Sequence, residues 1–248
     1  MPQYGFGSGS LWMTTSGSNK TPTRLGVLQN CGVDFKSNTK PLFGQNQLPV
    51  TVARGTMSVM GKGEFAQITS RFYDNIFFGA MSTAATGQIL AVDNEAGTIP
   101  AASGPYIVTV TNSATWTTDL GVIFAATGLP LTRVASGPTT GQYSVSAGVY
   151  TFAAADTLLG VKISYIWTAT GGEKLTIANQ AMGVAPTFST VLSIPYNSQK
   201  FTLTLNACVS ESISMTTSLE DFTKQPFSFA AFTDSSDTLG TLSFAEPI

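Results

Sequence analysis

The clearest pattern in the chain is an alternation of apolar and polar residues from Phe201 to Met215. Apolar side chains occupy the odd positions and Thr, Ser, Asn or Cys the even ones, which predicts a strand with one buried and one polar face. The run exceeds the usual strand length of about 5–6 residues, and Glu211 falls on its apolar face. We therefore expect a bend or bulge near residues 210–212.

Further strands are predicted on both sides of this run. Residues 50–60 alternate weakly, with Gly55 placed for a bulge. Residues 227–232 form another apolar run, and Pro226 before them lacks an N–H, so it should start the strand or lie at an edge. Short apolar runs separated by turn residues predict more strands, at 106–111, 122–125, 131–134, 143–145, 149–152, 161–167 and 188–194.

One helix is predicted, over residues 64–78. Phe65, Ile68, Phe72 and Ile76 fall on one stripe with helical spacing, which predicts packing against a sheet. Short strands with regular turns predict a sandwich or a barrel. The predicted fold class is therefore mainly β, an antiparallel β-sandwich or barrel with one flanking α-helix near residues 64–78.

The domain organisation expected is a single domain over residues 1–248. Residues 1–50 are rich in Gly, Ser, Thr, Asn and Pro and predict an amino-terminal arm followed by a long loop, residues 37–49, which we expect to contact a neighbouring subunit. Residues 80–104 carry few signals of order, and Asp93 and Glu95 indicate a solvated turn. Residues 91–172 are either an inserted β lobe or part of the core.

Composition suggests a surface that is covered in the assembled state. Hydrophobic residues make up 43% of the chain and charged residues only 10%, against roughly 25% in an average soluble domain. No apolar stretch is long enough for a spanning helix, and residues 1–5 lack the features of a secretory signal. We expect a cytosolic product whose flanks are covered by other copies, and an outer-membrane barrel is disfavoured.

Charge and residue types exclude several kinds of chemistry. The net charge is -2 and no two basic residues are adjacent, which argues against tight nucleic-acid binding. There is no histidine, so the usual base of a Ser or Cys triad and a zinc site are both disfavoured. Cys31 and Cys208 are expected to be reduced and partly buried. The Gly-Lys-Gly-Glu segment, residues 61–64, departs from the phosphate-loop spacing.

Two carboxylate pairs are candidates for a catalytic site. Glu220 and Asp221 would point to opposite faces of an extended backbone, and Asp234 and Asp237 lie in an expected hairpin loop. We therefore expect no enzyme, and no catalytic, cofactor-binding or metal-binding residues. Three tryptophans that could form a sugar platform are more typical of a core or an interface, namely Trp12, Trp116 and Trp167.

Several segments resemble the major tail tube proteins of tailed bacteriophages, most of all those of long-tailed phages. The resemblance is carried by residues 200–246, which read KFTLTLNACVSESISMTTSLEDFTKQPFSFAAFTDSSDTLGTLSFAE. It is also carried by residues 180–196, QAMGVAPTFSTVLSIPY, and by residues 61–79 and 118–167. Residues 1–50 match least.

The resemblance implies a structural virion protein of the tail, assembled in the cytoplasm of the host bacterium. Six copies would form a ring, and rings would stack into a hollow tube around the tape measure protein, with tail terminator and distal tail proteins at its ends. DNA would pass through without specific binding, and no membrane partner is implied. The alternative is a lectin-like or adhesin-like β-sandwich binding module, which predicts a monomer or small oligomer with an exposed aromatic patch.

A tube that conducts DNA should have a wall without positive charge, because lysine or arginine would hold the phosphates. The uncharged polar face of the long predicted strand is a candidate for this wall. Its residues are Thr202, Thr204, Asn206 and Cys208.

Overall fold

The computed structural model of the chain describes residues 5–16, 21–67, 69–79, 87–101, 103–197 and 199–245. Where the sequence predicted a single domain, the chain divides into two compact units. Unit 1 consists of Met1–Ser82 and Leu175–Ile248, and unit 2 of Thr83–Lys174, which contains the range 91–172. The described strands pair antiparallel apart from β8 with β9, and one helix of more than three residues accompanies them, so the predicted mainly β fold class is confirmed.

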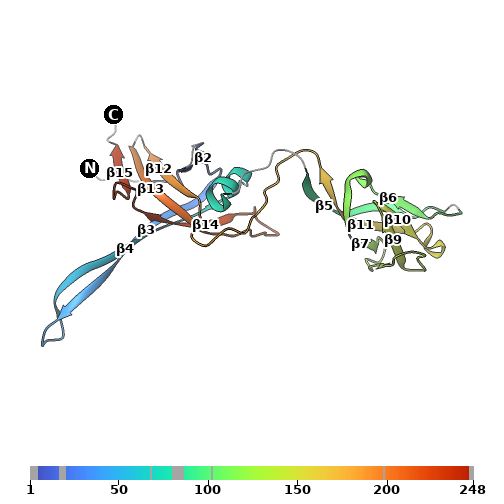
Figure 1. The fold of residues 1–248 in the computed structure, drawn as a ribbon, viewed down its shortest axis with the longest axis horizontal. Coiled ribbons are helices and arrows are strands. Elements are labelled where there is room, and N and C mark those ends of the chain that lie inside the picture. The colour runs from blue at the N-terminus through green and yellow to red at the C-terminus, as the bar shows by residue number, and fades with distance from the viewer. Residues whose placement is uncertain are drawn as a thin grey trace. The chain divides into compact units, whose positions relative to one another are not determined.

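Unit 1 is built on an eight-stranded sheet in the order β2-β1-β12-β13-β14-β4-β3, with β15 also paired to β13 (Figure 1). Its strands are β1 (Ser10–Thr15), β2 (Thr23–Arg24), β3 (Leu28–Phe43), β4 (Pro49–Phe65), β12 (Thr187–Tyr196), β13 (Gln199–Ile213), β14 (Gln225–Phe232) and β15 (Gly240–Ala245). Strands β14 and β15 pair with the same side of β13, one after the other along its length.

The sheet of unit 1 curls so that its two edges meet. Strands β2 and β3 lie at opposite ends of the strand order, yet only residues 25–27 separate them in the chain. The Leu25 N–H donates to the Leu11 carbonyl of β1, and the Ala66 N–H, just beyond β4, donates to the Val27 carbonyl. Because one short connection contacts both edges, the sheet wraps around its core as a barrel does.

The predicted helix is present but shorter, and it is a π-helix, η1 (Phe72–Phe78). Glu64 and Phe65 are instead the last residues of β4, paired with β14. The apolar stripe still faces one core, since Phe65, Phe72 and Ile76 are each 1% exposed, while Ile68 lies outside the described residues. Sheet pairing therefore overrode the helical spacing at the beginning of the stripe. Across the described ranges, no helix is both long and apolar enough to cross a bilayer.

The amino-terminal region differs from the predicted arm and loop. Residues 10–15 are strand β1, in register with β12, and most of the predicted loop at 37–49 belongs to β3. Only residues 44–48 connect β3 to β4. Turn-forming residues are tolerated because both strands here are solvent-exposed, so no buried side chain enforces alternation.

Strand β13 contains two irregularities, of which one was predicted. Glu211 has no partner of its own between the pairs of Ser210 and Ser212, so the expected bulge near residues 210–212 is confirmed. The extra residue returns Ile213, which pairs with Phe227, to the core side, and Glu211 itself is exposed to solvent. A second shift in the register of β13 with β12 lies between the partners of Phe188 and Thr190. It reverses which positions of β13 face the core before Cys208. Cys208 is thus in the core with 0% exposure, and its prediction as part of the polar face was wrong.

Aromatic rings packed on glycines join β14 to β4. Phe229 pairs with Gly61 and Phe227 with Gly63. A Cβ at Gly61 would lie 2.0 Å from the Phe229 ring, and one at Gly63 would lie 2.7 Å from the Phe227 ring. The two rings stack 6.0 Å apart and are buried. The glycines, which could have been mistaken for a phosphate loop, make room for these rings.

Unit 2 is a small sandwich whose core lies between two sheets. One sheet has the order β5-β11-β7 and the other β6-β10-β9-β8. Both contribute to one core, for example Val161 and Ile163 from β11 and Tyr150 from β10. The elements are β5 (Gln88–Thr98), β6 (Ile107–Thr109), η2 (Ser113–Thr115), β7 (Trp116–Phe124), β8 (Thr132–Arg133), β9 (Gln142–Ser146), β10 (Val149–Phe152), η3 (Ala154–Asp156) and β11 (Gly160–Ala169).

The six strands predicted within residues 106–167 are all present, with shifted ends, but β5 was missed. Asp93 and Asn94 lie at its centre, and because these residue types are typical of turns, the sequence predicted a turn here. In the structure Ser164 of β11 faces both residues across a bulge, and Asn94 has φ 58°. The Ser164 hydroxyl donates to Asp93 and accepts the Asn94 N–H. A bulge thus lets turn-forming residues stay within a strand.

We predict that Gly61→Ala lowers the free energy of unfolding by about 1–3 kcal/mol, as overpacking typically does. The added methyl meets the ring of Phe229, which is fully buried. Gly32→Ala is the matched control, since Gly32 is in the adjacent strand and a Cβ there would meet only Lys62, at 3.8 Å. Urea unfolding of both variants measures the difference, and equal stabilities would contradict the packing argument.

Candidate functional site

The most distinctive surface of unit 1 is an arm formed by β3 and β4 (Figure 1). Strand β4 pairs with β14 only from Val59 to Phe65, whereas β3 and β4 pair with each other far beyond that point. Residues 36–58, which we call the arm, therefore form a two-stranded ribbon, and every one of them is exposed. At about 3.3 Å per residue, Pro49 lies roughly 30 Å beyond the end of the shared sheet.

The arm exposes many large apolar side chains. Six of them are more than half exposed, namely Leu42, Phe43, Leu48, Val50, Val52 and Met57. An isolated two-stranded ribbon is at best marginally stable in water, and apolar side chains gathered on one exposed segment mark an interaction surface. The arm consequently has the composition of a segment that is covered when the protein performs its function.

The arm is also basic. Lys36, Lys40 and Arg54 are its charged residues, so three positive charges and no negative ones give a net charge of +3. At its base Lys62 forms an ion pair of 3.3 Å with Asp34. Near Lys36 the predicted bulge at Gly55 is confirmed, because Gly55 and Thr56 together face Asn38.

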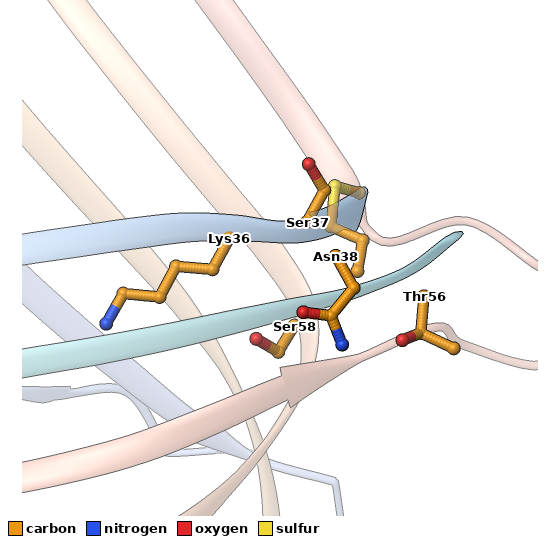
Figure 2. Close-up of a pocket in the computed structure, with 6 residues that line it drawn as sticks. Lys36, Ser37, Asn38, Thr56 and Ser58 are labelled. Atoms are coloured by element: carbon orange, nitrogen blue, oxygen red, sulfur yellow. The ribbon is translucent and has the colours of Figure 1, made fainter. Parts of the chain in front are cut away.

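The bulge shapes an open hollow of about 600 Å³ on the arm (Figure 2). It is lined by Lys36, Ser37, Asn38, Thr56, Met57 and Ser58. All of these residues come from the two exposed strands, so the hollow is a bend in an open surface and does not enclose a small molecule as a ligand pocket does. Its uncharged polar groups and single lysine suit contact with a protein surface.

A smaller, apolar hollow of about 60 Å³ lies where the arm leaves the sheet. Here β15 continues along β13 after β14 has ended, while β4 has turned away into the arm. The hollow is lined by Phe35 of β3, Leu203 and Leu205 of β13, and residues 239–242 at the start of β15. Leu242 is 52% exposed, so apolar surface borders the hollow.

The loop of residues 214–224, between β13 and β14, is a second exposed apolar feature. Leu219 is fully exposed, and Met215 and Phe222 are 69% and 85% exposed. The loop is held closed by the Thr216 hydroxyl, which donates to the Lys224 carbonyl over 2.8 Å. Its apolar side chains are exposed to solvent while this hydrogen bond fixes its backbone. Exposed apolar side chains on an ordered loop are typical of a contact surface.

The polar face predicted on the long strand is present without Cys208 and continues onto its neighbours. Thr202 lies between Ser193 of β12 and Ser243 of β15, and Thr204 lies between Val191 and Thr241. Directly opposite residues share a face of the sheet. The face therefore carries small, mostly hydroxyl-bearing side chains, with Lys200 of the same strand at its end.

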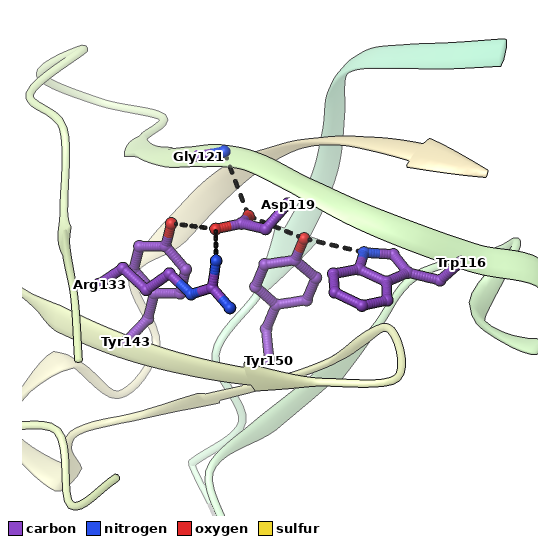
Figure 3. A network of polar contacts seen from close by, with 6 residues as sticks. All are labelled: Trp116, Asp119, Gly121, Arg133, Tyr143 and Tyr150. Atoms are coloured by element: carbon purple, nitrogen blue, oxygen red, sulfur yellow. Dashed lines mark hydrogen bonds and ion pairs between the residues drawn. The ribbon is translucent and has the colours of Figure 1, made fainter. Parts of the chain in front are cut away.

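In unit 2 a buried carboxylate collects several polar partners (Figure 3). Asp119 of β7 has a side chain only 4% exposed. Its Oδ2 accepts a bond of 2.7 Å from the Tyr143 hydroxyl and lies 3.7 Å from Arg133. Its Oδ1 accepts bonds from the Tyr150 hydroxyl at 3.0 Å and from the Gly121 N–H at 3.1 Å.

This network joins the two sheets of unit 2. Asp119 belongs to one sheet, and Tyr143 and Tyr150 belong to the other. Burial, reinforced by the Asp119 carboxylate, raises the pKa of both tyrosines, so they remain hydrogen-bond donors at any ordinary pH. A carboxylate that accepts hydrogen bonds from both sheets is a structural bridge between them.

In each of the two candidate carboxylate pairs, one acid is engaged by neighbouring groups of its own loop. Asp221 accepts a bond of 2.6 Å from Lys224, which holds the pKa of this exposed carboxyl below its usual range. Asp234 accepts the N–H groups of Thr238 and Ser236, which likewise lower its pKa, and it also accepts a bond from Asn206. Both acids stabilise loops of unit 1, and Asp237 is a turn residue with φ 55°.

The remaining candidates are dispersed. Cys208 is buried and Cys31 half-buried, and burial raises the pKa of each thiol to about 11, so neither is a reactive thiolate. Over the described part of the chain, no three His, Cys, Asp or Glu side chains lie close enough to hold a metal ion. Trp12 belongs to unit 1, where Arg24 lies over its ring, whereas Trp116 and Trp167 pair in unit 2.

Comparison with known proteins adds no family assignment. No protein-family model matches the chain, and no curated protein sequence does so either. The resemblance to tail tube proteins rests on the residues of the chain itself.

We predict that Asp119→Ala destabilises unit 2, because it leaves two buried tyrosine hydroxyls without their acceptor. Each unpaired buried group costs about 1–3 kcal/mol. Asp119→Asn is the control, because its amide oxygen can still accept a hydrogen bond at this position. Thermal unfolding of the full chain, followed by tryptophan fluorescence, compares the two. If Asp119→Ala unfolds at the temperature of the wild type, the network does not hold the sheets together.

Proposed function

We propose that the protein is a structural subunit that assembles into the hollow tail tube of a bacteriophage. The observation that carries this proposal is the arm, an exposed ribbon with six large apolar side chains and three basic ones. Such a ribbon is stabilised when another surface covers it, and a second copy of the chain supplies that surface in a self-assembling protein.

The low charge of the chain supports the same function. Only 10% of its residues are charged, which is few for a monomer that must stay in solution. Exposed apolar side chains also occur on the loop of residues 214–224 and on β15. A subunit in a stack of rings is contacted on several sides, so these surfaces become buried in the assembly. Contacts between unlike surfaces of identical subunits produce such rings and filaments.

The hexameric ring and its partners follow from the resemblance to tail tube proteins. Rings of six copies stack around the tape measure protein, with tail terminator and distal tail proteins at the two ends. The face around Thr202 and Thr204 suits the inner wall, because the small hydroxyl side chains there carry no positive charge that would hold phosphates, and Lys200 lies at its end. DNA then passes during ejection without being held.

Removal of the arm tests assembly directly. Lys36 pairs with Ser58, so joining them through an Asn-Gly turn removes residues 37–57 and leaves the sheet intact. Deleting residues 37–47 alone would remove one strand of the ribbon and leave the other unpaired. We expect negative-stain electron microscopy to show hollow filaments of the wild type and none of the shortened variant.

Circular dichroism and size-exclusion chromatography provide the control for this experiment, since the shortened chain should remain a folded small species. Normal filaments from the shortened variant would show that the arm is not required. A wild type that stays monomeric at high concentration, even with other tail components, would favour the lectin-like binding module and reject the tube.

The inner wall is tested by placing charge on it. We predict that Thr202→Lys with Thr204→Lys slows DNA ejection from virions that carry the variant, because lysines in the bore attract phosphates. Thr118→Lys with Thr132→Lys, at exposed positions of unit 2, adds the same charge elsewhere and should leave ejection unchanged. Ejection kinetics measured by dye binding to released DNA would refute the assignment if both variants match the wild type.

A further inference from the structure

Two unlike surfaces lie at opposite ends of β14. Gln225 at its beginning pairs with Phe65, and Ala231 near its end pairs with Val59. The loop of residues 214–224 immediately precedes Gln225, whereas the arm begins just beyond Val59. One end of the sheet therefore presents the loop and the other presents the arm with the apolar hollow at its base.

The two ends carry opposite charge. The arm has a net charge of +3, from three basic residues and no acidic one. Residues 211–224 contain three acidic residues, Glu211, Glu220 and Asp221, against the single basic Lys224, which gives a net charge of -2. Lys224 is already engaged with Asp221. Glu211 and Glu220 are both exposed, so their charge is presented to an approaching molecule.

The two ends also complement each other in shape. The loop projects Leu219 and Phe222 into solvent, at 100% and 85% exposure. The opposite end has the apolar hollow of about 60 Å³ lined by Phe35, Leu203 and Leu205. A projecting apolar side chain and an apolar recess are the two halves of a typical anchoring contact.

We propose that successive copies of the chain join head to tail, with the loop of one copy seated at the base of the arm of the next. Leu219 or Phe222 occupies the apolar hollow, and Glu220 meets Lys36 where the arm begins. The arm then runs on past the loop, so that its more distant charges, Lys40 and Arg54, reach toward Glu211. This inference rests on the proposed tube and names the surfaces that join its subunits.

A second copy fits these surfaces better than a nucleic acid does. The three cations of the arm are interspersed with six exposed apolar side chains, and phosphate-binding surfaces require denser positive charge. A contact between unlike surfaces at opposite ends of one molecule also repeats without limit, which produces a filament.

A charge exchange between two variants tests the pairing. Lys36→Glu with Lys40→Glu makes the arm acidic, and Glu211→Lys with Glu220→Lys makes the loop end basic. In each variant alone, arm and loop repel each other, so the concentration needed for filament growth should rise at least about tenfold. In an equal mixture the acidic arm meets the basic loop and the basic arm meets the acidic loop, so filaments should return.

A control and a second variant guard against loss of folding. Asp93→Lys with Lys162→Glu exchanges charges within unit 2 and should leave assembly unchanged. Leu219→Asp alters a fully exposed side chain, so the monomer should keep its circular dichroism spectrum while filament growth is lost. Light scattering and electron microscopy measure growth in each case.

The outcomes separate this inference from the proposed tube. If the wild type forms filaments but the mixture does not recover them, or if either variant grows alone as the wild type does, the head-to-tail pairing is wrong and the tube stands. If the wild type never forms filaments, the tube itself is rejected. Binding of a labelled DNA duplex by the wild type but not by the acidic-arm variant would assign the arm to nucleic acid instead.

Discussion

The packing of two phenylalanines on two glycines determines how unit 1 presents its surfaces. Phe227 and Phe229 lie on Gly63 and Gly61, in a contact too close for any other residue on β4. It anchors β4 to β14, and beyond Val59, where this pairing ends, β3 and β4 continue as the arm. The arm therefore begins where the pairing held by this anchor ends.

Bulges place the charged and polar residues of the fold. Glu211 would lie in the core if β13 were regular, and the shift before Cys208 places it on the outer face, next to the acidic loop. The same device keeps Asn94 within β5 and bends the arm at Gly55. In each case one additional residue reverses the side-chain alternation and resolves a conflict between local sequence and sheet.

The sequence was most informative where burial enforces a pattern. Six strands of unit 2, the bulge near residues 210–212 and the core positions Phe72 and Ile76 could be predicted, because buried side chains recur with a fixed period. In the arm, the strand over residues 50–60 and its bulge at Gly55 could be predicted, but the facing strand could not, since it is exposed, needs no alternation and carries Pro and Asn residues that resemble a loop. The shift before Cys208 also escaped prediction, because it depends on the partner strand β12.

The two ends of unit 2 lie next to each other, which determines where the chain can accept a different domain. Gln88 and Ala169, close to its two ends, are direct partners in β5 and β11. The chain thus enters and leaves the unit at neighbouring points, as in domains that accept insertion. Such a unit can be replaced by another domain whose first and last residues are similarly close together, while the strands of unit 1 keep their register. The position of unit 2 in the chain is therefore a natural one at which to attach foreign domains to the subunit.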